Sequence, residues 1–150
     1  MHNDHDRHVL VTPKTTWPRN VASNGLGMEK LENSVYSLTH SEKYKSLEFV
    51  FYQCIATHNP DTLHEILGEN PYHLAALLQL SEAFKQSGDI EHAADFVERI
   101  LYSFEVCLHP SFSISTPSTL DYDRIESRII FIAIYRHIQY LARRGCYRYY

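Results

Sequence analysis

The sequence predicts an all-α protein made of antiparallel helical hairpins, an incomplete α-solenoid that follows a disordered N-terminal arm. Two observations lead to this fold class. From residue 41 onward, apolar residues recur at intervals of three and four, the period of an amphipathic helix. Two such runs also meet at Gly88, with small residues where large ones are usual. We expect a flexible arm at 1–40, a helical-repeat domain at 41–146 and a tail at 147–150.

Length and composition narrow the class of protein. A chain of 150 residues that is 44% hydrophobic and 21% charged can bury one core. No apolar run approaches the roughly 18 residues of a membrane span, and the N-terminus lacks the apolar block of a signal peptide. We therefore expect a soluble, intracellular protein with no membrane partner. Cys54, Cys107 and Cys146 are odd in number and far apart, which favours reduced packing residues over a disulfide framework.

The first 40 residues hold several helix breakers. Thr12-Pro13, Trp17-Pro18 and the glycine-containing run at 24–27 lie too close together for a long helix. This spacing predicts an extended, largely mobile arm.

Two helices are expected next. Ser41 can cap a helix whose apolar positions run to about Thr57, and Pro60 can begin a shorter one that ends near Gly68. The apolar positions of the first helix are Tyr44, Leu47, Phe51, Cys54 and Ile55.

The region 74–104 predicts an antiparallel hairpin that turns at Gly88. The facing apolar residues are Leu74, Leu77, Leu80 and Phe84 on one helix, and Ile90, Ala93, Val97, Ile100 and Phe104 on the other. Their order is similar to the tetratricopeptide pattern of about 34 residues. Helices pack at about 8 to 10 Å between axes only if the crossing point carries small side chains. We expect Ser81 and Ala93 to form that point.

A last helix is expected from about Tyr122 to Arg144, with Gly145 ending it. It is apolar over most of its circumference, which predicts burial on two sides. A solenoid covers its apolar faces by stacking, and here one layer lacks its neighbour. We therefore expect either a fragment of a longer helical protein or a chain that covers this layer by dimerising.

The search for chemistry finds no common catalytic motif. A phosphate loop, an HExxH helix, a nucleophile elbow and a CxxC pair are all absent, so we expect no enzyme, no cofactor, no metal and no small-molecule substrate. Cys107 and His109 are two residues apart, but we interpret them as packing and helix-end residues, because no oxyanion-stabilising arrangement accompanies them.

Charge is uneven along the chain. Six arginines against three carboxylates occupy 121–150, although the net charge is −4. This end is either a docking surface, with an rRNA contact possible, or a solvated helix face.

Five residues are candidates for partner binding: Tyr72, His73, Phe112, Arg124 and Arg128. Each also has a structural interpretation. Tyr72 could seal a helix start, Phe112 could hold its loop on the core, and Arg124 could pair with a neighbouring carboxylate.

Several segments together resemble the transcription factor 25 family, also called nuclear localized protein 1. They are "HSEKY" at 40–44, "NPYHLAALLQLSE" at 70–82, "VERILYSFE" at 97–105, "HPSFS" at 109–113, "LDYDRIESR" at 120–128 and "RRGC" at 143–146, with "WP" at 17–18 and "GLGMEKLE" at 25–32 before them. The resemblance covers about residues 17–146, and its specificity lies in the combination.

The resemblance implies a non-catalytic helical-repeat factor that acts on stalled large ribosomal subunits. Its partners would be a Listerin-type ubiquitin ligase, a nascent-chain-binding factor and an AAA-class segregase, in the cytoplasm, the nucleus or both. Some members of the family are described as nuclear transcriptional repressors. Two hypotheses therefore stay open: a quality control scaffold and a nuclear regulator that contacts protein or DNA.

Overall fold

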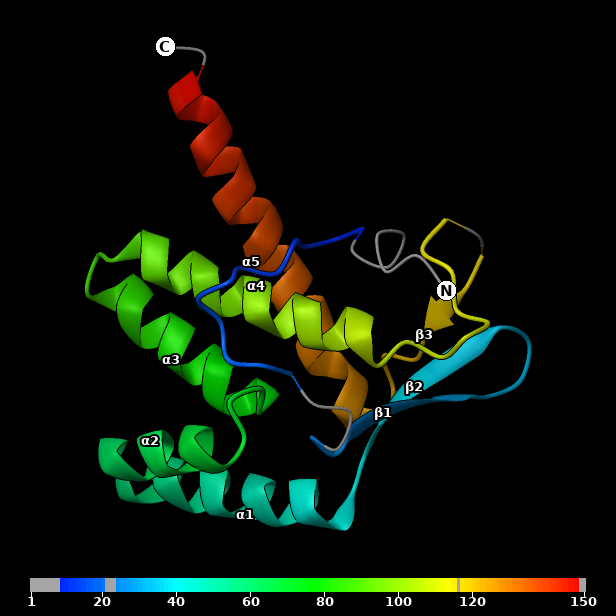
Figure 1. Cartoon of the computed structure of the whole chain (residues 1–150), viewed down its shortest axis with the longest axis horizontal. Helices are drawn as coiled ribbons and strands as arrows, with labels where there is room; N and C mark the ends of the chain where they lie inside the picture. Colours follow the sequence, from blue (N-terminus) through cyan, green and yellow to red (C-terminus); the bar gives the residue numbers. More distant parts are fainter. Residues whose placement is uncertain (1–8, 21–23, 116, 149–150) are drawn as a thin grey trace.

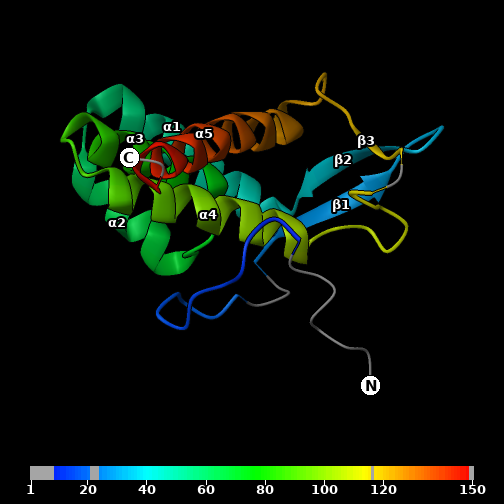
Figure 2. The same cartoon turned by 90° about the horizontal axis from the view of Figure 1, so that it is seen from above.

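The computed structural model describes residues 9–20, 24–115 and 117–148. Its elements, in chain order, are β1 (Leu26–Lys30), β2 (Val35–His40), α1 (Glu42–Thr57), α2 (Pro60–Glu69), α3 (Leu74–Gln86), α4 (Ile90–Val106), β3 (Thr119–Leu120) and α5 (Ile125–Arg148). Figures 1 and 2 show the sheet at one end and the helices at the other, with α5 running from the sheet along α4. In the part of the chain described, no helix combines the length and apolar character that a membrane span needs.

The first two helices begin and end as the sequence predicts. The Ser41 hydroxyl accepts a hydrogen bond from the backbone N–H of Tyr44 at 3.2 Å, which caps α1. The side chain of Asn59 caps α2, and proline occupies the first turn, where its missing N–H costs nothing. The predicted helices at 41–57 and 60–68 are confirmed.

The predicted hairpin is also confirmed. Gly88 makes the turn between α3 and α4 with φ +84°, a conformation that glycine adopts without steric cost. Ser81 and Ala93 lie at the contact, and both are 0% exposed. The Ser81 hydroxyl donates to the carbonyl oxygen of Ala93 at 2.7 Å. The small residues therefore allow close approach, and the serine adds a hydrogen bond across the helix pair.

The all-α prediction is wrong, because residues 26–40 and 119–120 form a three-stranded sheet in the order β1-β2-β3. β1 pairs antiparallel with β2, with Met28 opposite Leu38, and β2 pairs parallel with β3. Asn33 and Ser34 make the β1–β2 turn with positive φ angles of 54° and 61°. The fold is helix-rich with a small mixed sheet, and the tetratricopeptide-like solenoid stays a prediction.

The disordered arm is a second correction. Residues 24–40 contain β1 and β2, and the preceding segment buries Val11 and Trp17 to 6% and 7% exposure. Gly25 packs closely against the start of α1, because a Cβ at this position would lie 2.5 Å from the hydroxyl oxygen of Ser41. The absence of a side chain at Gly25 permits this close approach and does not indicate mobility. The parts of the predicted arm at 1–8 and 21–23 lie outside the described residues.

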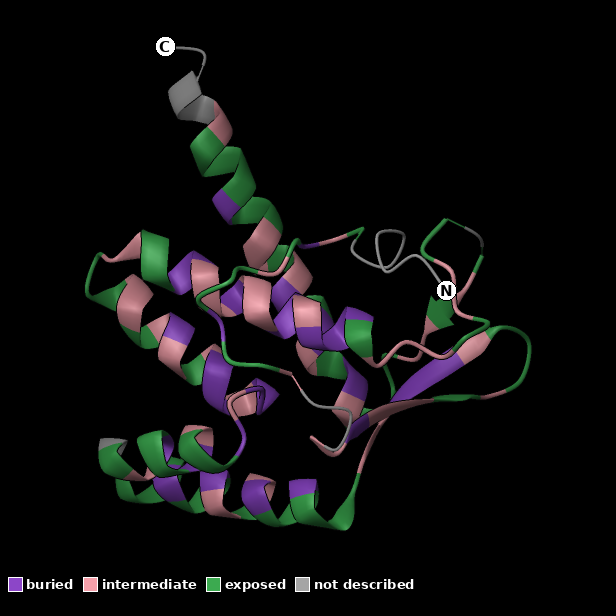
Figure 3. Ribbon diagram, viewed as in Figure 1, coloured by how far each residue is buried: buried purple, intermediate pink, exposed green. Residues whose placement is uncertain are grey.

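The last helix differs from the prediction in three ways. It begins at Ile125, continues through Gly145 to Arg148, and is buried on one side only. A glycine inside a helix costs about 1 kcal/mol, too little to end a helix already more than five turns long. Residues 147–148 of the predicted tail therefore belong to α5, and 149–150 lie outside the described residues. Figure 3 shows buried and exposed positions alternating along α5.

The Ser81–Ala93 contact gives a stability prediction. Ala93→Leu forces extra methylenes into a fully buried crossing point, so the free energy of unfolding should fall by about 1–3 kcal/mol. Urea unfolding followed by circular dichroism measures it. Ala83→Leu, at an exposed position of α3, is the control and should change stability by under about 0.5 kcal/mol. Equal effects of the two substitutions would contradict the close contact.

Candidate functional site: a helix face held by the N-terminal segment

The segment 9–20 is fixed to α4 by a buried carboxylate. Glu105 is 4% exposed, and its two oxygens accept hydrogen bonds from three consecutive backbone N–H groups. Val9 donates at 2.7 Å, and Leu10 and Val11 donate at 2.9 Å. A buried carboxylate is tolerated when such charge-assisted bonds satisfy it. Glu105 therefore joins two parts of the chain that are more than 90 residues apart in sequence.

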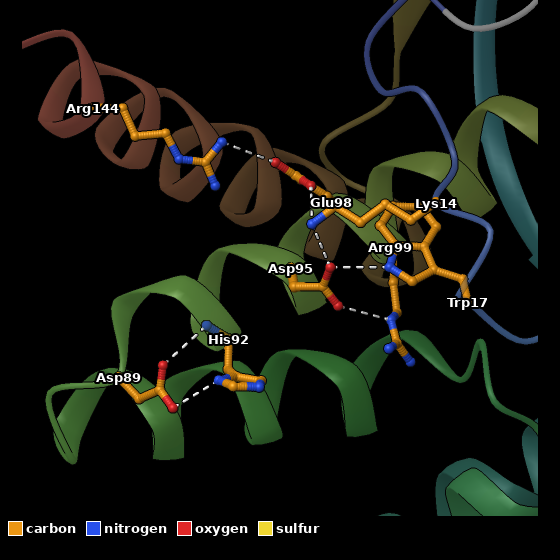
Figure 4. Close-up of polar contacts among 8 residues, drawn as sticks. All are labelled: Lys14, Trp17, Asp89, His92, Asp95, Glu98, Arg99 and Arg144. Atoms are coloured by element: carbon orange, nitrogen blue, oxygen red, sulfur yellow. Dashed lines mark hydrogen bonds and ion pairs between the residues drawn. The ribbon is translucent and has the colours of Figure 1, made fainter. Parts of the chain in front are cut away.

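A second anchor lies two to three turns earlier on α4 (Figure 4). Asp95 accepts from the Lys14 ammonium at 2.8 Å and from the Trp17 indole N–H at 3.0 Å, and Arg99 Nε lies 3.2 Å from its other oxygen. Burial alone would raise the pKa of Asp95, but the bonds from Lys14 and Trp17 and the charges of Lys14 and Arg99 outweigh it and lower the pKa. The same hydrogen bond raises the pKa of Lys14.

Helix α5 rests on this anchored layer. Arg144 Nη1 lies 3.5 Å from Glu98 on α4, and Arg136 Nε lies 2.9 Å from Glu82 on α3. At the other end of α5, the Ser127 hydroxyl accepts from the backbone N–H of Leu38 at 3.1 Å. Ser127 is fully buried. Because β3 pairs only with Val35 and Tyr36 of β2, the backbone N–H of Leu38 is free to bond to Ser127 of α5.

The side of α5 that points away from α3 and α4 carries large apolar side chains, and we call it the α5 outer face. Its exposed members are Ile125 (71%), Phe131 (38%), Ile132 (46%), Tyr135 (60%) and Ile138 (58%). Single exposed apolar residues are normal on the surface of a monomer, whereas several on one side of a helix indicate an interaction surface. This surface is the candidate functional site.

The arginines of α5 are largely engaged within the chain. Besides Arg136 and Arg144, Arg124 lies 3.9 Å from Asp121, and Arg128 donates to the carbonyl of Tyr122 at 2.9 Å. The Arg128 guanidinium also lies 5.3 Å from the centre of the Tyr122 ring. The two predicted partner residues, Arg124 just before α5 and Arg128 in its first turn, are therefore exposed, but each already has an intramolecular partner.

The other three candidates lie mostly inside. Tyr72 is 1% exposed and donates to the carbonyl of Pro18, and His73 is 0% exposed between α1 and α3. Phe112 is half-buried and packs edge-to-face on Tyr36 at 5.0 Å. Arg124 and Arg128 lie at the start of α5, whereas Tyr72 and His73 lie just before α3. Partner binding by these five residues stays a prediction, since a buried side chain needs local opening before it contacts a partner.

Cys107 and His109 do not form a reactive pair. Burial raises the pKa of the Cys107 thiol to about 12, and its Sγ lies 3.2 Å from the carbonyl oxygen of Phe104. His109 instead bonds to Ser111 at 2.9 Å. Within the described ranges, no group of three or more His, Cys, Asp or Glu side chains could hold a metal ion.

Sequence reasoning missed the residues that hold the site in place. No local pattern in the sequence distinguishes Asp95 or Ser127 from other polar residues of a helix. One signal was available for Glu105, because it stands where a repeat unit usually ends with proline. Their partners lie far away in the sequence, so local spacing could not identify them.

These features define a helix-rich class of protein in which a folded N-terminal segment and a small sheet support a long helix with an uncovered apolar side. The family model described as "Transcriptional repressor TCF25" matches residues 36–149. The chain belongs to this TCF25 family, as the resemblance predicted.

Curated relatives agree with this assignment. A human protein named "Ribosome quality control complex subunit TCF25" is 40% identical over 144 residues, which cover 93% of this chain and 21% of the relative. "Ribosome quality control complex subunit 1" of Schizosaccharomyces pombe is 38% identical over 148 residues, covering 95% and 22%. "Probable transcription factor claV" of Ampulloclitocybe clavipes is 36% identical over 118 residues, covering 78% and 15%. The chain thus spans about a fifth of the length of the first two relatives. No solved structure matches it significantly.

The Asp95 anchor predicts a pH dependence. A lowered pKa in the folded state means that the unfolded state binds more protons near the ordinary value of 3.8. The contribution of the ionised Asp95 carboxylate to the free energy of unfolding is therefore fully present above that value and is lost as pH falls through the lowered pKa. The stability difference between the natural chain and Asp95→Asn should be constant above about pH 5 and shrink toward pH 3.

Chemical unfolding at a series of pH values measures this difference. Asp123→Asn, at an exposed position before α5, is the matched control and should give a small difference throughout. An Asp95→Asn difference that stays constant or grows as pH falls would show that the carboxylate is not held by Lys14 and Trp17.

Proposed function

We propose that this chain is part of a non-catalytic scaffold in ribosome-associated quality control, where it assists the ubiquitylation of stalled nascent chains on the large ribosomal subunit. The observation that supports this most is the 40% identity over 93% of the chain with a human protein named as a subunit of the ribosome quality control complex. A fission yeast relative carries the same kind of name. Neither name is that of an enzyme.

The geometry favours a protein as the direct contact of the α5 outer face. Phosphate binding needs arginines free to neutralise phosphates. Four arginines of α5 or its approach already have partners within the chain, whereas Tyr135 and Ile138 are more than half exposed. We therefore assign the α5 outer face to a protein component such as the ubiquitin ligase, and treat an rRNA contact as secondary. The corresponding location is the cytoplasm, with a nuclear pool also expected.

Co-sedimentation tests the ribosomal role. A tagged chain should be enriched with large subunits from cells treated to stall translation, compared with untreated cells. The human relative serves as the positive control under the same conditions. If that relative sediments with stalled particles and this chain does not, the proposal is overturned for the region studied.

Substitution on the α5 outer face should reduce that association. Ile138→Asp places a charge where an apolar contact is expected, and loss of a central contact residue costs about 2 kcal/mol or more, roughly a 30-fold loss of affinity. Gln53→Asp, at an exposed position of α1, is the control, because it adds the same charge outside the α5 outer face. Both variants should unfold at nearly the same temperature, because both positions are exposed. Equal association of the two variants would exclude this face.

A nuclear regulatory role is the second candidate, favoured by the family description and by the relative named as a probable transcription factor. A regulator that contacts DNA directly through the arginines should lose affinity steeply with salt, because each phosphate contact releases counterions. A binding curve for a 20-base-pair duplex between 50 and 200 mM salt measures this. A flat curve would leave protein contacts as the only route to such a role.

A further inference from the structure

A small groove lies between α1, the start of α3 and the start of α5, and we call it the α1–α5 groove. Its apolar lining comes from Tyr52 on α1, Leu74 and Ala75 on α3, and Ile125 and Ile129 on α5. Its volume is about 250 Å³. Pockets for drug-sized ligands and cofactors run from about 300 to 1,000 Å³, so this groove is better matched to one long side chain.

Two carboxylates from different helices face the groove. Glu48 comes from α1 and Glu126 from the first turn of α5. The one lysine in the lining, Lys45, lies 3.4 Å from Glu42 outside it. Burial is the main cause that lowers the pKa of His40, so this ring is neutral at pH 7. The groove therefore carries a local excess of negative charge.

Among the described residues, Glu48 forms no ion pair with a lysine or an arginine, and its one ion-pair candidate is His73. Its oxygen lies 3.0 Å from Nε2 of His73, which is completely buried. The other ring nitrogen, Nδ1, accepts the backbone N–H of Ala76 at 3.2 Å. The Glu48 carboxylate is therefore not balanced by an ion pair with a lysine or an arginine.

Glu126 has neither a hydrogen bond nor an ion pair in the part of the chain that the structure describes. The positive end of the α5 dipole explains why an acidic residue is favourable in the first turn. It does not explain why a second carboxylate from α1 faces the same groove, since two like charges at one site repel each other. A cation between them would remove that repulsion.

The surroundings identify the kind of cation. Tyr52 and Ile125 at the groove are 59% and 71% exposed, and Phe49, one turn from Tyr52 on α1, is 65% exposed. A solvated metal ion gains nothing from contact with apolar side chains, whereas a Lys or Arg side chain packs its methylene stem along them. Nucleic acid is disfavoured, because its phosphates would meet Glu48 and Glu126.

We propose that the α1–α5 groove receives a Lys or Arg side chain from an amphipathic helix of a partner protein, whose neighbouring apolar residues cover Tyr52 and Ile125. The charge of the groove complements a basic residue, and its apolar rim complements the leucine-like residues one turn before and after it. The groove shares Ile125 with the α5 outer face, but its two carboxylates lie outside that face, and the proposal holds whether or not the chain acts on ribosomes.

NMR titration of the isotope-labelled chain tests the charge preference. Butylguanidinium chloride, which stands for an arginine side chain, should shift the signals of His40, Ala75 and Ile129 in a saturable way with a millimolar dissociation constant. n-Pentanol has similar length without the charge and should bind at least fivefold more weakly. Equal affinity for the two probes, or guanidinium shifts spread over all acidic surfaces, would overturn the proposal.

Matched variants locate the site. Glu126→Gln should weaken butylguanidinium binding at least fivefold and lower stability only through the lost helix-dipole interaction, because the Glu126 carboxylate has no hydrogen bond or ion pair to lose. Glu91→Gln is the control, since Glu91 is also a first-turn carboxylate, on α4, and is not part of the groove lining. A similar loss in both variants, or none in Glu126→Gln, would show that the groove does not select a cation.

A peptide titration tests the helix partner. The probe is an 18-residue alanine-based helix with one arginine flanked by leucines four residues before and three after, and the comparison peptide has glutamine in place of arginine. The arginine peptide should bind at least fivefold more tightly, and Glu126→Gln should abolish the difference. Equal binding of both peptides would overturn the proposal. So would a concentration-dependent dimer, seen by light scattering, that Glu126→Gln dissociates, because the groove would then be a self-interface.

Discussion

The contact between Ser81 and Ala93 is the constraint on which the rest of the structure depends. It lets α3 and α4 approach closely, and its 2.7 Å hydrogen bond satisfies a hydroxyl that would otherwise be buried without a partner. Once α4 is fixed against α3, its remaining sides become the support for everything else. The N-terminal segment attaches through Glu105 and Asp95, and α5 contacts the same helix. A larger side chain at Ala93 would therefore disturb both layers.

Polar side chains connect parts of this fold that hydrophobic packing alone would leave loosely defined. Apolar contact is non-directional, so it does not by itself fix how a strand or an irregular segment lies on a helix. Glu105 fixes the segment 9–11 by accepting three successive N–H groups, and Ser127 fixes β2 on α5 through the N–H of Leu38. Each polar group is buried, and leaving its partner unsatisfied would cost about 1–3 kcal/mol. These bonds give the fold its specific arrangement.

The sequence predicted the helices well because periodicity and capping are local properties. Ser41, Asn59 and Gly88 act within a few residues of themselves, so their effects can be read without a structure. The strands were missed for a local reason too: the β1–β2 turn uses Asn33 and Ser34 with positive φ in place of the usual glycine. The order of 9–20 could not be predicted, because the group that holds it, Glu105, is more than 90 residues away. The candidate site could not be predicted for the same reason, because the exposure of the α5 outer face depends on which helices, distant in sequence, pack against α5.

Two surfaces of different electrostatic character lie on this chain. The α5 outer face is apolar, and four arginines on or just before α5 have partners within the chain, whereas the α1–α5 groove is lined by two carboxylates. Like charges across an interface cost affinity, so an acidic partner segment would be repelled by the groove, whereas an uncharged apolar segment suits the α5 outer face. Ile125 belongs to both surfaces, so two partners that each cover this residue would compete for it. Under the proposed function, the difference in charge would let the two surfaces select different partner proteins.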